Sequence, residues 1–152
     1  MRLHILAIGR QRPGPLRDLQ ALYAGRIAPP VAIVELDEKR RLPAAALKAR
    51  EAELILAAAP SEARLIALDR RGVGWSSRDL AQALARWRDR GDAAAAFAIG
   101  GAEGLDRIVL DRADRVLSFG AMTWPHLLVR VMLLEQLYRA QQILAGHPYH
   151  RD

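Results

Sequence analysis

The chain has 152 residues, of which 51% are hydrophobic, and it contains no cysteine. A chain of this length can bury a hydrophobic core without help from a metal or a disulfide. The lack of cysteine excludes a disulfide framework, a cysteine zinc site and a thiol nucleophile. No apolar run approaches the roughly 18 residues of a membrane span, and the apolar stretch after Arg2 is too short for a secretory signal. We expect one soluble, cytoplasmic domain over residues 1–152, with no membrane partner.

Basic residues exceed acidic residues by 23 to 17, a formal excess of six positive charges. Lysine occurs only at Lys39 and Lys48, so nearly all of the basic charge is arginine. A guanidinium group binds phosphate through two hydrogen bonds and stacks on bases, which makes nucleic acid a candidate partner. A GC-rich coding bias produces the same composition, because the chain is also very rich in alanine. The charge alone leaves both explanations open.

Short apolar runs alternate with segments of helical spacing, and glycine or proline separates them. The pattern predicts strands over residues 3–9, 31–36, 64–69, 95–99 and 116–119. It predicts helices over residues 16–27, 43–60, 76–91, 105–113 and 124–144. Strands that are apolar on both faces and alternate with helices indicate an α/β fold, in which helices flank a mostly parallel sheet.

Local signals place the ends of several elements. Gly72 and Gly74 are expected to close the third strand, and Ser76 or Ser77 is expected to cap the helix that follows. Thr123 is the candidate cap of the last helix, with Pro125 in its first turn.

In parallel α/β sheets ligands bind at the carboxyl ends of the strands, so the loops that follow the predicted strands are the candidate binding loops. The loop after the fourth strand, residues 100–104, has glycine at three of its five positions, which lets a ligand press directly on the backbone. An ordinary strand-to-helix turn has the same composition. The loop is neither a G-x-G-x-x-G motif nor a P-loop, which disfavours a nicotinamide-dependent oxidoreductase.

The loop after the fifth strand, residues 120–125, carries two large apolar side chains, Met122 and Trp124. On a loop, such side chains suit a pocket for a flat heterocycle whose edge is bound by free backbone groups. They would equally serve to anchor the loop to the core, and the residues alone do not decide between these two interpretations.

The C-terminal tail combines imidazole, phenol and guanidinium groups at His147, Tyr149, His150 and Arg151. Such a set can stack on a base, bind phosphate and move a proton. A metal site built from His147, His150 and Asp152 is an alternative that the spacing supports only weakly, and we expect no metal.

The last predicted helix has apolar residues on nearly all sides, and Glu135 and Arg139 are spaced to form an ion pair along it. A helix of this kind must be covered on nearly all sides, and in a small domain a second subunit is the natural cover. We therefore expect a homodimer.

These segments, in this order, resemble the RlmH family of SPOUT-class enzymes, which methylate N3 of a pseudouridine in 23S ribosomal RNA. The matching runs are residues 100–105, 122–130, 135–140 and 147–151. The resemblance spans nearly the whole chain; it is strongest from Leu65 onward and loose before Pro60. The segment over residues 10–28 matches poorly, so no functional residue is assigned there.

The resemblance implies a SPOUT α/β domain with a C-terminal trefoil knot, an exception to the rule against knots. It implies a homodimer that uses S-adenosylmethionine to methylate 23S ribosomal RNA in the large subunit or the whole ribosome. The tail would lie near the methyl donor or in the partner's pocket. The cofactor pocket would be formed by Leu68, Gly101, Gly120, Ala121, Met122, Thr123, Trp124 and Pro125.

The implied reaction needs a base, because an imide nitrogen is a weak nucleophile while it holds its proton. His126 beside the cofactor loop and His150 in the tail are the two candidates. Arg151 would stabilise the developing anion or hold a phosphate, and Tyr149 would stack on the target base or position it.

The alternative to an enzyme is a ribosome-associated RNA-binding protein that has the same fold and no catalytic activity. The choice between pseudouridine and uridine, and between the ribosome and free RNA, rests on the resemblance alone.

Overall fold

The computed structural model describes residues 1–151 and contains one five-stranded sheet with the order β2-β1-β4-β3-β5. Every neighbouring pair of strands is parallel, which confirms the predicted sheet type. The strands are β1 (Arg2–Ile8), β2 (Ala32–Leu36), β3 (Ala63–Gly74), β4 (Ala94–Ile99) and β5 (Arg115–Ser118).

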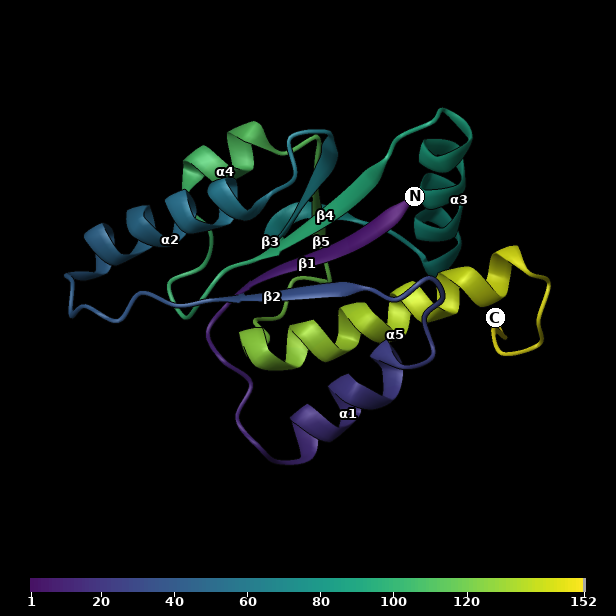
Figure 1. Cartoon of the computed structure of the whole chain (residues 1–152), viewed down its shortest axis with the longest axis horizontal. Coiled ribbons are helices and arrows are strands. Elements are labelled where there is room, and N and C mark those ends of the chain that lie inside the picture. The colour runs from purple at the N-terminus through teal and green to yellow at the C-terminus, as the bar shows by residue number, and fades with distance from the viewer. Residues whose placement is uncertain (152) are drawn as a thin grey trace.

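Helices cover both faces of this sheet (Figure 1). On one face lie α2 (Ala44–Ala58) and α4 (Arg107–Arg112). On the other lie α1 (Pro15–Ala24), α3 (Ser77–Asp89) and α5 (His126–Leu144). The predicted α/β architecture is therefore confirmed, and all five carboxyl ends of the strands meet at one edge of the sheet.

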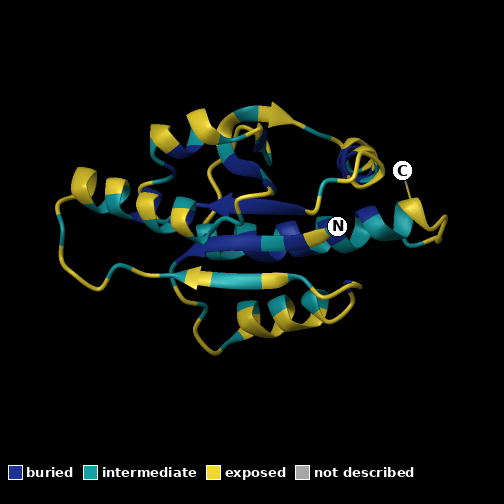
Figure 2. Cartoon of the chain, turned by 45° about the horizontal axis from the view of Figure 1, so that its top comes forward, coloured by how far each residue is buried: buried dark blue, intermediate teal, exposed yellow. Residues whose placement is uncertain are grey.

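Alternation along the strands divides the hydrophobic core into two layers. On β1, Ile5 and Ala7 pack with the core beneath α1, α3 and α5, while Leu6 and Ile8 pack with the core beneath α2 and α4. The central strands are therefore buried and the edge strand β2 is only half-buried (Figure 2). No helix within residues 1–151 is both long and apolar enough to span a membrane.

The third strand does not end at Asp69 as the glycines suggested. Its pairing with β5 shifts register between Leu68 and Val73, both of which face Leu117, so the strand bulges and then resumes to Gly74. Gly72 permits this because its Cα lies against the β5 backbone: an added Cβ would stand 2.5 Å from the Val116 carbonyl oxygen. The glycine marks a close approach of two strands rather than a strand end.

Several helix ends also differ from the prediction. Ser76 caps α3 in a capping box with Asp79, which settles the choice between the two serines. The last helix begins at His126 with Pro125 as its N-cap, so the predicted Thr123 cap is wrong, as is the placement of Pro125 inside the first turn. The remaining three helices are also shorter than predicted: α1 ends at Ala24, α2 covers only Ala44–Ala58, and α4 begins only after Asp106, which caps it.

Most of the apolar surface of α5 is covered within the chain. Val131, Leu133, Leu134 and Leu137 are buried against α1, α3 and the sheet. This helix therefore does not need a second subunit to cover it. The prediction of a homodimer is supported by the family resemblance and not by an uncovered helix.

Candidate active site

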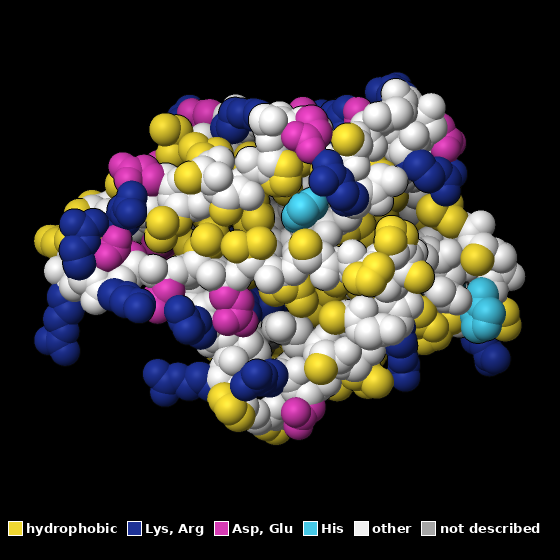
Figure 3. Space-filling view, in the orientation of Figure 1, with side chains coloured by type: hydrophobic (Ala, Val, Ile, Leu, Met, Phe, Trp, Pro, Cys, Tyr) yellow, Lys and Arg dark blue, Asp and Glu magenta, His cyan; other side chains and the backbone are white. Residues whose placement is uncertain are grey.

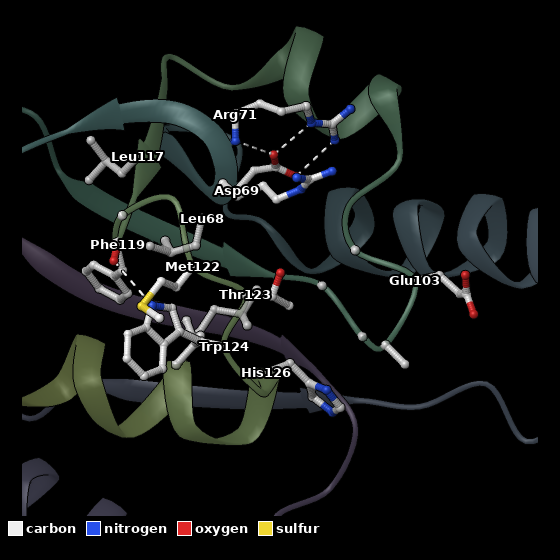
Figure 4. Close-up of a pocket in the computed structure, with 18 of the residues that line it drawn as sticks. Leu68, Asp69, Arg71, Glu103, Leu117, Phe119, Met122, Thr123, Trp124 and His126 are labelled. Carbon is white, nitrogen blue, oxygen red and sulfur yellow. Dashed lines mark hydrogen bonds and ion pairs between the residues drawn. The ribbon is translucent and has the colours of Figure 1, made fainter.

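A cavity of about 390 Å³ opens at the carboxyl edge of the sheet, where the bulge of β3 and the segments after β4 and β5 meet the start of α5 (Figure 4). Its apolar floor consists of Leu68 before the bulge of β3, Ile99 at the end of β4 and Leu117 near the end of β5. This volume lies within the range of small-molecule sites in proteins, about 300–1,000 Å³. The edge predicted from the strand order is therefore the edge that holds the cavity.

The glycine loop forms one wall through its backbone. The amide of Gly104 donates to the carbonyl of Gly101 at 3.0 Å, which closes a tight turn. A Cβ on Gly100 would stand 2.6 Å from the backbone of Gly104, and a Cβ on Gly101 would stand 2.9 Å from the Cγ2 atom of Ile8. Glycine is therefore required at both positions by close packing, and the backbone of residues 100–104 lines the cavity.

The second loop forms the opposite wall. Met122 is 73% exposed and Trp124 is 40% exposed, and both line the cavity. The indole Nε1 of Trp124 donates to the Phe119 carbonyl at 3.3 Å, and the Ser118 hydroxyl bonds the backbone of Gly120. The loop is thus held by its own hydrogen bonds rather than by burial of its apolar side chains, which favours the pocket interpretation over the anchoring one.

A polar group lies across the cavity from these side chains. Asp69 accepts hydrogen bonds from the backbone and guanidinium of Arg71, and these bonds hold the pKa of its carboxyl below the ordinary range. Figure 4 shows Phe119, Met122 and Trp124 together on one side, with Asp69 and Arg71 on the other. The cavity therefore has one apolar, aromatic side and one charged side.

His126 also lines the cavity, from the first turn of α5, and is half-buried. Its Nε2 atom lies 3.3 Å from where a Cβ on Gly9 would be. Burial, and secondarily the nearby Arg130 cation, lower the pKa of its imidazole. The ring is therefore neutral at pH 7 and able to accept a proton.

Arg130 lies one turn further along α5 and is completely buried. Its guanidinium donates to the Glu35 carboxylate at 2.7 Å and to the Gly9 carbonyl at 2.9 Å. It thereby ties the start of α5 to the ends of β1 and β2, which fixes His126 at the cavity.

The C-terminal tail folds back on the far half of α5 instead of reaching this cavity (Figure 1). The Tyr149 hydroxyl donates to Glu135 at 3.0 Å, and burial, together with this bond, raises the pKa of the phenol to about 12. Arg139 bonds Glu135, as the spacing predicted, and lies 3.3 Å from His150 Nδ1. Arg151 is exposed.

The structure thus brings together most, but not all, of the predicted site residues. The predicted residues that line the cavity are Leu68, Gly101, Gly120, Met122, Thr123, Trp124 and His126. Ala121 and Pro125 belong to the loop over residues 120–125 but do not line the cavity. Tyr149, His150 and Arg151 do not line the cavity. The tail therefore does not lie beside the pocket of its own chain.

Sequence reasoning missed Lys48, Glu51 and Asp69. Lys48 and Asp69 line the cavity, and Glu51 is a buried carboxyl whose oxygens stand 3.2 and 3.3 Å from where a Cβ on Gly101 would be. Nothing in the local pattern of α2 distinguishes Lys48 or Glu51 from the other charged residues of that helix. The position of Asp69 at the end of the predicted strand over residues 64–69 was a usable signal, although the strand continues to Gly74.

Residues 1–151 contain no cluster of three metal-ligating side chains. The alternative metal site includes Asp152, which lies outside the described residues.

Comparison with known proteins places the chain in a family. A family model described as a predicted SPOUT methyltransferase matches residues 1–150. The ribosomal RNA large subunit methyltransferases H of Rhodospirillum centenum and Paramagnetospirillum magneticum are 55% and 53% identical over 151 residues, which is 99% of this chain and 99% of each relative. A solved methyltransferase structure from Legionella pneumophila, with the cofactor SAM bound, has the same fold: its TM-score is 0.51 at 13% identity, over 92% of this chain and 66% of that one. The chain belongs to the SPOUT methyltransferase family.

Proposed function

We propose that this protein transfers a methyl group from S-adenosylmethionine to N3 of a pseudouridine in 23S ribosomal RNA. The substrate is the large subunit or whole ribosome, so the site of action is the cytoplasm, and residues 1–152 act as one SPOUT domain with a C-terminal knot. The observation that carries the proposal is the cavity between the two predicted loops, in a chain more than half identical to ribosomal RNA large subunit methyltransferases H.

The residues of the cavity fit an adenosyl compound. The exposed backbone at Gly101 and along residues 120–125 offers donors and acceptors to the edge of a purine, while Leu68 and Trp124 provide apolar contact for its faces. Lys48, which lines the cavity, is placed to pair with the cofactor's carboxylate. When bound there, the cofactor supplies a methyl group on a positively charged sulfur.

His126 is the proposed base. It is neutral at pH 7, and one of its ring nitrogens can take the proton from N3 of the target base when that base enters the cavity. Arg130 holds α5 against β1, which fixes the distance between this imidazole and the cofactor loops. Orientation of this kind supplies much of the rate in a transfer between two bound groups.

The tail requires a second copy of the chain if it is to take part. Tyr149 bonds Glu135, nine residues beyond His126 on α5, which is about 14 Å along the helix axis. We propose a homodimer in which the tail of each subunit, with Tyr149, His150 and Arg151, covers the cavity of the other.

Methyl transfer to ribosomes tests the proposal. Ribosomes from a strain that lacks this methylation are incubated with the purified protein and labelled S-adenosylmethionine, and the modified nucleoside is mapped by mass spectrometry of the large-subunit RNA. We expect one methyl group on one pseudouridine, and calorimetry should show cofactor binding that Gly101→Val abolishes. Ribosome binding without methyl transfer would instead support an RNA-binding protein without catalytic activity.

A further inference from the structure

Three arginines project from the segment that joins β1 to α1 and from the first turn of α1. We call residues 10–17, with Arg10, Arg12 and Arg17, the arginine loop. All three side chains are exposed. Arg10 lies 3.9 Å from the exposed carboxylate of Asp37, a weak pair in water. Arg12 and Arg17 form no ion pair or hydrogen bond with any of residues 1–151.

A groove of about 260 Å³ runs along this loop beside the catalytic cavity. It is lined by residues 10–16 and by Leu127 of α5. Leu127 directly follows His126, which lines the cavity, so consecutive residues in the first turn of α5 line the groove and the cavity. A strand lying in the groove would contact the residue that follows the proposed base.

The loop is held in place by the same buried arginine that positions His126. Arg130 bonds the Gly9 carbonyl and the Glu35 carboxylate, and the same Glu35 oxygen accepts from the backbone amide of Gln11 at 3.1 Å. The start of the loop is thus fixed from both sides. A cationic loop that is already ordered loses little conformational entropy when it binds an anion.

The positive charge continues onto the neighbouring segment. Lys39 and Arg41, between β2 and α2, are also exposed and make no ion pair within residues 1–151. In Figure 3 lysine and arginine side chains project from the lower left of the molecule, where these two segments lie. These exposed cations, with the carboxylates of Asp37 and Glu38 between them, lie at the carboxyl edge of the sheet, where the cavity opens.

We propose that the arginine loop binds the phosphate backbone of the ribosomal RNA strand that flanks the target nucleotide, so that the target base enters the adjoining cavity. The inference rests on the proposed function. S-Adenosylmethionine carries no phosphate, so arginines beside its cavity have no phosphate of the cofactor to bind. Guanidinium forks on phosphate oxygens position a nucleic acid without reading its bases, and the target base must leave its stack to be methylated.

The test compares Arg10→Gln/Arg12→Gln with a control that removes the same charge elsewhere. The control is Arg86→Gln/Arg90→Gln, two exposed positions on and just after α3, at the other end of the molecule (Figure 1). Binding to unmethylated ribosomes is measured by sedimentation, and methyl transfer is measured in parallel, across a series of salt concentrations.

We expect the loop variant to raise Kd and KM on the order of 10-fold relative to the control, with kcat nearly unchanged. The slope of log Kd against log salt should be shallower by about 1.4 to 1.8, because each lost phosphate contact removes about 0.7 to 0.9. Cofactor affinity by calorimetry should not change, because neither arginine lines the cavity.

Equal Kd values and salt slopes in the two double variants would overturn the inference. A weaker Kd with an unchanged slope would also overturn it, because the contact would then be with ribosomal protein rather than phosphate. A wild-type chain that binds ribosomes but transfers no methyl group would refute the proposed function alone, since the binding comparison still decides the role of the loop. A wild-type chain that neither binds ribosomes nor transfers a methyl group would refute both the proposed function and the role of the arginine loop.

Discussion

At the scale of single residues, the most unusual group behind the cavity is the carboxyl of Glu51. It is 8% exposed, and its Oε2 atom has no hydrogen-bond partner in the described chain. Burial, together with the negative charges of Glu103 and Asp37, raises its pKa. The carboxyl lies behind Gly101, with its oxygens 3.2 and 3.3 Å from where a Cβ on that glycine would be.

Glu51→Gln should stabilise the protein at alkaline pH. A carboxyl whose pKa is raised by folding contributes its full stability below the ordinary pKa and loses it as the pH rises through the folded value. Glutamine has the same shape and does not ionise, so the variant should equal the wild type at pH 4 and exceed it at pH 8 by about 1 kcal/mol. Urea unfolding at both pH values measures the difference. Glu53→Gln, on the exposed face of α2, is the control, and a constant difference between Glu51→Gln and the wild type at all pH values would contradict this account.

Arg130 is the second buried charge, and it acts on His126 through space. Arg130→Met should raise the pKa of His126, because one of the two causes that lower it is removed. The pKa should remain below the ordinary value, because burial, the larger cause, remains. An NMR titration of the imidazole protons measures both effects. Arg86→Met on α3 is the control, and an unchanged His126 pKa in Arg130→Met would refute this electrostatic link.

At the scale of the elements, the third strand depends on a glycine at the point where it bulges. Gly72 and Gly74 lie two residues apart on β3, but only Gly72 is in close contact: an added Cβ meets the β5 backbone at Gly72 and open space at Gly74. The bulge lies at the cavity, because Asp69 and Arg71 fall within it and both line the cavity.

The two glycines form a matched pair of substitutions. Gly72→Ala should destabilise the protein by about 2 kcal/mol, because the methyl group forces β3 and β5 apart. Gly74→Ala should lie within about 0.5 kcal/mol of the wild type. Thermal unfolding followed by circular dichroism gives both values. Similar losses in the two variants would show that general loss of glycine flexibility, and not this contact, is responsible.

At the scale of the whole molecule, the separation of tail and cavity is the main constraint on the mechanism. The tail is tied to Glu135 and Arg139 on the far half of α5, while His126 begins the near half. A rigid helix separates the two groups, so one chain cannot close its own tail over its own cavity without unfolding that end.

Mixing two inactive variants tests the dimer. Gly101→Val distorts the glycine wall of the cavity, because its side chain would meet Ile8 and Glu51, and Tyr149→Ala/Arg151→Ala disables the tail, so each homodimer should be inactive. In a mixed dimer one cavity meets one intact tail, so an equimolar mixture should recover about a quarter of the wild-type activity if subunits exchange freely. Methyl incorporation into ribosomes provides the readout, and co-expression with two different tags ensures mixing. No recovery in purified mixed dimers would contradict a site shared between subunits.

Much of this fold could be predicted because its signals are local. Each strand is a short apolar run, and Ser76 with Asp79 marks a helix start within four residues. The carboxyl edge follows from parallel pairing, so the two loops at residues 100–104 and 120–125 could be placed there before any coordinate was known. The resemblance then supplied the reaction and the cofactor, which neither composition nor spacing contains.

Only the tertiary structure decided the rest, because it depends on residues far apart in the chain. Arg130 bonds Glu35, which lies 95 residues away in the sequence, and no local pattern distinguishes Arg130 from an arginine on a solvent-exposed helix face. The position of Glu51 behind Gly101 and the close approach of β5 to Gly72 likewise depend on elements that are far apart in the sequence. The sequence by itself determined which elements form and which edge of the sheet carries the chemistry; the packing of those elements decided which charged residues are buried behind the site and on which side of α5 the tail ends.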